Sequence, residues 1–108
     1  MQRIGQLAWS MIVLAAVGVS ASNAQDLGQA DKGHALARQV CSECHAIDKS
    51  QDPSPNSAAP RFEAIANIPG MTTMALTVAL RTPHRAMPNL ILDIDQIRDV
   101  AAYILSLK

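Results

Sequence analysis

The sequence has few of the residues that usually build or crosslink a small protein core. Aromatic residues make up only 3% of its 108 residues, and there are two cysteines. Two cysteines exclude a disulfide-rich miniprotein, which needs several bridges. Nine basic side chains balance nine acidic ones, so no basic excess favours binding to nucleic-acid phosphates. The length indicates one domain, whose interior must be filled by something other than aromatic side chains.

Residues 1–24 have the layout of a secretory signal peptide. A short positive start precedes an apolar stretch over residues 4–19, and small residues follow. Ser22 and Ala24 occupy the small-x-small positions, which predicts cleavage after Ala24. The alternative is an uncleaved anchor, but the apolar stretch is shorter than the ~20 residues that a spanning helix needs. We therefore expect export to the periplasm, with no stable membrane insertion of the mature chain.

The mature chain is predicted to be a domain that depends on a cofactor. Removing residues 1–24 from 108 leaves 84 residues, numbered 25–108. Phe62 and Tyr103 are then the remaining aromatic residues. A domain of this size buries only ~60–65% of the surface of its unfolded chain. Such domains are marginally stable unless a metal, a cofactor or crosslinks support them.

The segment Cys41-Ser42-Glu43-Cys44-His45 has the pattern of a covalent haem attachment site. When such a segment turns helically, its two thiols can reach the two vinyl groups of one porphyrin and form thioethers. The adjacent histidine is then placed to donate an imidazole nitrogen to iron. The pattern predicts one haem c, attached through Cys41 and Cys44 and ligated by His45.

Three other uses of this segment are weaker. A structural zinc site would need four protein ligands, and no second Cys/His pair follows at finger-like spacing. A thioredoxin-like redox pair normally accompanies alternating strands and helices, and the chain shows no convincing strand. A plain disulfide would suit an exported protein, but it would leave His45 unexplained and the core unfilled.

Met87 is predicted to be the second axial ligand. It lies in the proline-bounded segment 82–89, and prolines stop a helix and stiffen an extended segment that can hold a sulfur toward iron. The other donors in the mature chain are Met71, Met74, His34 and His84. The two methionines lie in a helical pattern and suit packing, whereas the rival His84 lies in the same loop as Met87. His34 follows a helix start and is expected to be exposed.

The apolar periodicity predicts an all-α fold of about four helices. The first is expected to begin at Asp26, which forms a possible capping box with Gln29, and to run into the haem motif. The others are expected after Pro60 as far as Pro69-Gly70, over residues 72–81, and from Asp93, which has Gln96 three residues later. Residues 48–59 are polar and proline-rich and are predicted to form a loop. The last helix has a long apolar face, formed by Ile97, Val100, Ile104 and Leu107.

The order of these features resembles that of small bacterial class I c-type cytochromes, the monohaem cytochrome c family, over essentially the whole mature chain. The resemblance implies a bundle around a covalently attached haem, with Gly33 meeting Tyr103 where the first and last helices cross. It also implies that the carbonyl of Pro60 accepts a hydrogen bond from the free ring nitrogen of His45. Two departures are the absence of tryptophan from the mature chain and Ala37 at a position where many relatives have an aromatic residue.

The resemblance implies a one-electron carrier and not an enzyme. An iron with two protein axial ligands has no open position for a substrate, so the haem would exchange electrons with redox proteins such as a dehydrogenase, an oxidase or another cytochrome. The carrier is expected to be a monomer. One alternative is a haem-based gas sensor or small peroxidase with a labile sixth ligand. Another is a dedicated cytochrome subunit of a periplasmic dehydrogenase.

Overall fold

The computed structural model describes residue 18, residues 28–84 and residues 86–108. Its elements are α1 (Ala30–Val40), α2 (Phe62–Ala66), α3 (Thr73–Arg81) and α4 (Ile94–Leu105). These described ranges contain no strand, so the predicted all-α class with four helices is confirmed. Each helix in them is too short or too polar to cross a bilayer. The predicted signal peptide, apart from residue 18, and Asp26 lie outside the described residues.

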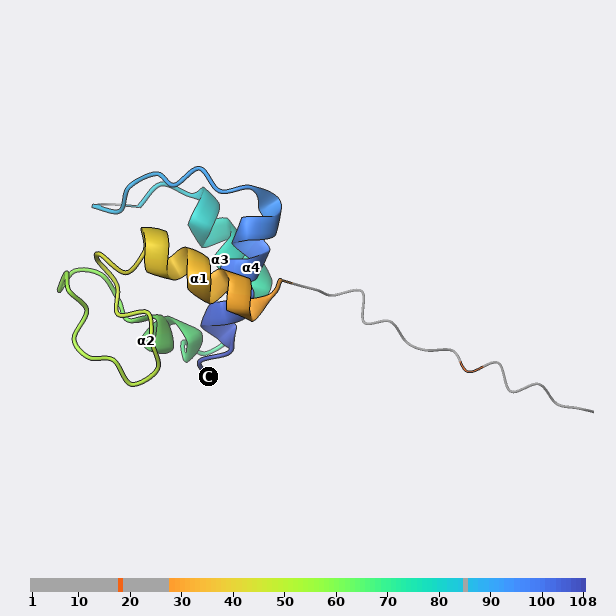
Figure 1. Cartoon of the computed structure of the whole chain (residues 1–108), viewed down its shortest axis with the longest axis horizontal. Helices are drawn as coiled ribbons and strands as arrows, with labels where there is room; N and C mark the ends of the chain where they lie inside the picture. Colours follow the sequence, from red (N-terminus) through yellow and green to blue (C-terminus); the bar gives the residue numbers. More distant parts are fainter. Residues whose placement is uncertain (1–17, 19–27, 85) are drawn as a thin grey trace, which may run out of the picture.

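Helix α4 is the element around which the others are arranged. It contacts α1, α2 and α3, and its most extensive contact is with α1, which crosses it in Figure 1. The apolar face predicted for the last helix is buried at Ile97, Val100 and Ile104 of α4 and at Leu107, which follows the end of the helix. Tyr103 beside this face packs in the same core cluster as Ala37, Phe62 and Leu76, which come from the three other helices. The core therefore lies between α4 and the rest of the bundle.

The boundaries of α3 and α4 agree with their sequence signals. Thr72 is the N-cap of α3, and its hydroxyl accepts a hydrogen bond from the backbone N–H of Ala75 at 3.1 Å. Asp93 and Gln96 form the predicted capping box at the start of α4, with distances of 2.9 and 3.0 Å. Between α2 and α3 the chain turns at Gly70, whose φ of +78° is a conformation that glycine adopts without steric cost.

The start of α1 differs from the prediction. The helix begins at Ala30 rather than at Asp26, and its N-cap residue, Gln29, has no side-chain cap. The carboxylate of Asp99 in α4 instead accepts a hydrogen bond from the backbone N–H of Gln29 at 2.7 Å. Asp99 thus supplies the acceptor for a backbone N–H at the beginning of α1. Its carboxylate also places a negative charge at the positive end of that helix.

Gly33 allows α1 and α4 to approach each other closely. A Cβ built on Gly33 would overlap the backbone carbonyl of Asp99 and would lie 2.9 Å from the Cβ of Tyr103. The contact between Gly33 and Tyr103 expected from the resemblance is therefore present. Because the nearest obstruction is backbone rather than a flexible side chain, only glycine fits without moving one helix.

Gly33→Ala should lower the free energy of unfolding of the haem-loaded protein by about 1–3 kcal/mol, because overpacking outweighs the better helix propensity of alanine. Denaturant titration followed by circular dichroism measures the change. The control is Gln39→Ala, at an exposed position of the same helix, which should stay within about 0.5 kcal/mol of the wild type. A Gly33→Ala variant as stable as the wild type would contradict the packing argument.

Candidate functional site

The Cys-x-x-Cys-His segment forms a tight turn directly after α1. The backbone N–H of Cys41 donates to the carbonyl of Ala37 at 2.8 Å, and the N–H of His45 donates to the carbonyl of Cys41 at 2.9 Å. These bonds continue the helical path, so that the two sulfur-bearing residues and His45 are presented by one turn. Cys41 is buried, Cys44 is half-buried, and both are free thiols.

The environment of Cys41 does not favour a reactive thiolate. Burial raises the pKa of the Cys41 thiol to about 11, so the thiol is protonated at neutral pH. Redox-active Cys-x-x-Cys pairs depend on a cysteine whose pKa is lowered by its surroundings. The thioredoxin-like alternative therefore has no support in the local electrostatics.

The imidazole of His45 is held in one tautomer. Its Nδ1 lies 2.6 Å from the carbonyl oxygen of Pro60. A carbonyl oxygen can only accept a hydrogen bond, so Nδ1 must carry the proton that it donates. The lone pair of the neutral ring is then on Nε2, which is the nitrogen free to bind a metal. The ring of Phe62 lies beside the imidazole, with ring centroids 5.3 Å apart and an angle of 51° between the planes.

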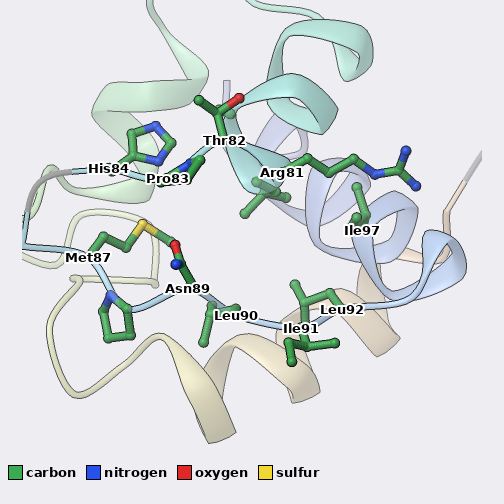
Figure 2. A pocket seen from close by; sticks show the side chains of 13 residues that line it. Arg81, Thr82, Pro83, His84, Met87, Asn89, Leu90, Ile91, Leu92 and Ile97 are labelled. Carbon is green, nitrogen blue, oxygen red and sulfur yellow. The ribbon is translucent and has the colours of Figure 1, made fainter.

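Met87 lies half-buried in the loop between α3 and α4, on the wall of a pocket of about 390 Å³. Apolar and polar side chains both line this pocket (Figure 2), among them Leu90, Leu92, Ile97, Arg81, Thr82 and Asn89. The end of α3 and the loop containing Met87 therefore supply a wall that contains apolar side chains and a thioether. This chemistry suits one side of a flat, largely apolar ring, and thioether sulfur is an axial ligand of haem iron.

The other sequence candidates have different surroundings. His34 is half-buried rather than exposed as predicted, because its Nε2 lies 2.8 Å from a carboxylate oxygen of Asp48 and its ring stacks on Tyr103. Met71 packs against the core as expected, but Met74 is 72% exposed, so the prediction that it packs in the interior is wrong. His84 is exposed and lines the same pocket as Met87.

Tyr103 forms a supporting contact that the sequence did not indicate. Its hydroxyl donates to the carbonyl of Ile47, two residues after His45, at 2.8 Å, and lies 3.3 Å from the carboxylate of Asp48. The same carboxylate pairs with His34 of α1. The segment that follows His45 is thus connected to both α1 and α4. Residues 48–59 form the predicted loop without helix or strand.

Tyr103 should make the protein less stable at high pH. Burial and the adjacent Asp48 carboxylate raise the pKa of its phenol to about 12, from an ordinary value of 10. The folded state favours the protonated phenol, so this contribution is complete below pH 10 and is lost as the pH rises through 12. At 1.36 kcal/mol per pKa unit, the loss amounts to roughly 2–3 kcal/mol.

Denaturant titrations of the haem-loaded protein between pH 9 and 12 measure this dependence, and Tyr103→Phe should remove it. The same variant should lower the free energy of unfolding by about 1–2 kcal/mol at neutral pH, because the hydrogen bond to the carbonyl of Ile47 is lost. The tyrosinate absorbance gives a direct check, since the chain contains one tyrosine. An ordinary tyrosine titration in the folded protein would contradict the assignment.

In the described part of the chain, no group of three or more His, Cys, Asp and Glu side chains could hold a metal ion. The alternative of a structural zinc site therefore finds no ligand set among these residues. The residues that do come together are two free thiols and a histidine with its Nε2 lone pair free, all on one turn. This donor set fits a haem held by two thioethers and one imidazole. An all-α bundle with such a turn defines the class of c-type cytochromes.

Comparison with known proteins agrees with this class. The family model described as Cytochrome c matches residues 30–108. The chain is also 33% identical over 90 residues to a protein named Cytochrome c-552 from Bradyrhizobium diazoefficiens, covering 82% of this chain and 86% of that protein. No solved structure matches significantly. The chain belongs to the cytochrome c family. It is a c-type cytochrome of electron transport, and its cofactor is one covalently bound haem c.

Proposed function

We propose that this protein is a periplasmic, monomeric, monohaem electron carrier. Cys41 and Cys44 form the two thioethers, and His45 and Met87 are the axial ligands. The observation that carries the proposal is the 2.6 Å contact between His45 Nδ1 and the carbonyl of Pro60. This contact leaves Nε2 as the metal-binding nitrogen, on the same turn as both thiols.

The residues of the site have separate tasks. When bound, the haem supplies an iron centre that gains and loses one electron. The carbonyl of Pro60 accepts a hydrogen bond from the Nδ1–H of His45, which fixes the ring orientation and makes the imidazole a stronger electron donor. The thioether of Met87 is a weaker donor than imidazole and favours the reduced state, which raises the reduction potential. Apolar residues that line the same pocket, such as Leu80 and Ile97, make the surroundings of this ligand less polar.

Two protein axial ligands leave no coordination position for a substrate, and this argues for a carrier rather than an enzyme. The partners are then other redox proteins, such as a dehydrogenase, an oxidase or another cytochrome. Periplasmic residence is supported by the signal-peptide layout of residues 1–24.

A spectroelectrochemical titration combined with carbon monoxide addition tests this function. We expect a single one-electron transition and low-spin spectra in both redox states. Carbon monoxide added to the reduced protein at neutral pH should leave its spectrum unchanged, because Met87 occupies the sixth position. Ready carbon monoxide binding would instead favour a gas sensor or peroxidase. Co-purification with a larger redox enzyme would indicate a dedicated subunit rather than a free carrier.

A further inference from the structure

Both backbone polar groups of Ala46, the residue after His45, are hydrogen-bonded, and they belong to two successive peptide groups. The backbone N–H of Ala46 donates to the hydroxyl of Ser54 at 2.9 Å. The carbonyl of Ala46 accepts from the backbone N–H of Phe62 at 2.9 Å. Ala46 itself is fully buried, with 0% of its surface exposed. The N–H belongs to the peptide that joins His45 to Ala46, and burial leaves the Ser54 hydroxyl as its acceptor in place of water.

Among the described residues, Ser54 is the one in the polar or charged class that is buried, with 7% of its surface exposed. It comes from the polar loop 48–59, where serines and prolines are otherwise at the surface. Removing its hydroxyl would leave the N–H of Ala46 buried without an acceptor, which is destabilising unless the peptide rotates. Rotation of that peptide moves the backbone to which His45 is attached.

The same loop binds the chain on either side of Ala46. The side-chain oxygen of Gln51 accepts from the N–H groups of Ile47 and Asp48 at 3.0 and 3.1 Å. The N–H of Asn56 donates to the carbonyl of Cys44 at 3.0 Å. Residues 44–48 are thus bound along their length by residues 51–62, the segment that also supplies the Pro60 carbonyl to His45.

We infer that Ser54 is a positioning residue for His45. Its hydroxyl holds the Ala46 peptide in the one orientation that directs the His45 Nδ1–H at the Pro60 carbonyl. The inference rests on the proposed role of His45 as an iron ligand. Its consequence is electronic as well as structural. A weaker Nδ1–H hydrogen bond makes the imidazole a poorer donor, stabilises the oxidised iron less, and raises the reduction potential.

The experiment compares Ser54→Ala with Ser54→Thr and with Thr72→Ala in the haem-loaded mature protein. Thr72→Ala is the matched control, because it also removes a neutral hydroxyl that accepts a backbone N–H, but at the start of α3. In Ser54→Ala, hydrogen exchange of the His45 Nδ1–H, followed by nuclear magnetic resonance, should accelerate at least tenfold. The reduction potential should rise. Ser54→Thr, which keeps the hydroxyl, should restore both values toward those of the wild type.

Thr72→Ala should lower the stability to a similar extent and leave the exchange rate and the potential unchanged. If Ser54→Ala is destabilised but behaves like Thr72→Ala in both readouts, Ser54 is a structural residue only and the inference is overturned. The wild-type spectra report separately on the proposed function. If the His45 ring resonances lack the displacement caused by bonding to oxidised haem iron, the ligand assignment itself fails, whatever the Ser54 variants do.

Discussion

The double variant Cys41→Ser, Cys44→Ser is expected to be purified without covalent haem and without a cooperatively folded core. The two thiols lie on one turn, and Cys41 belongs to the buried core cluster. A mature chain of this size has little stability to spare without a cofactor. We therefore expect loss of essentially all covalent haem and a decrease of more than about 5 kcal/mol in the free energy of unfolding, enough to unfold a typical domain.

Circular dichroism and the visible spectrum after acid extraction measure this result. The control is Ser42→Ala, which lies between the cysteines, keeps both thiols and loses only a hydrogen bond to the carbonyl of Arg38. It should carry haem like the wild type. A double variant that stays compact and cooperatively folded without haem would show that the cofactor is not part of the core.

Met87→Ala should produce the second-largest change, in the spectrum and potential of a protein that still carries haem. The absorption feature that methionine ligation gives to the oxidised protein should disappear. The reduction potential should fall by on the order of 0.1 V, a modest part of the ~0.8 V range over which axial ligands set haem potentials. The fall is expected because water or another donor that replaces the sulfur stabilises the oxidised iron more strongly.

The chain offers a matched control for this variant. Met74→Ala removes a methionine that is 72% exposed on α3, and it should change neither the spectrum nor the potential. Loss of the methionine feature in Met71→Ala instead of Met87→Ala would show that the ligand is misassigned. If the feature is retained in Met71→Ala and Met87→Ala but lost in Met74→Ala, both the ligand assignment and the exposed position of Met74 on α3 would be wrong.

The sequence predicted most accurately those elements whose signals are local. The capping box of Asp93 and Gln96 depends on residues three positions apart, and α4 begins where this signal places it. The apolar face of α4 was also predictable, because burial of a helix face follows its 3.6-residue period.

Contacts between distant segments were not predictable in the same way. The backbone N–H of Gln29, at the beginning of α1, has its acceptor on Asp99, 70 residues away, which no local signal indicates. His34 is half-buried because Asp48 and Tyr103 meet it from two other segments. No periodicity or spacing in the sequence reports such meetings.

The candidate site shows both cases. The Cys-x-x-Cys-His pattern is local, and its residues lie on one turn as the pattern requires. The composition of residues 48–59 predicted a loop. It did not distinguish Ser54, which is buried and accepts a hydrogen bond from the N–H of Ala46, from the serines at the surface. The selection of Ser54 depends on how the loop folds back over residues 44–48, which only the three-dimensional structure describes.

The intact mass of the mature protein under denaturing conditions is the decisive test of covalent haem attachment. We expect the polypeptide to carry the mass of one haem after acid extraction, and we expect neither Cys41 nor Cys44 to react with an alkylating reagent. A chain that releases its chromophore on denaturation and takes up two alkyl groups would contradict covalent attachment.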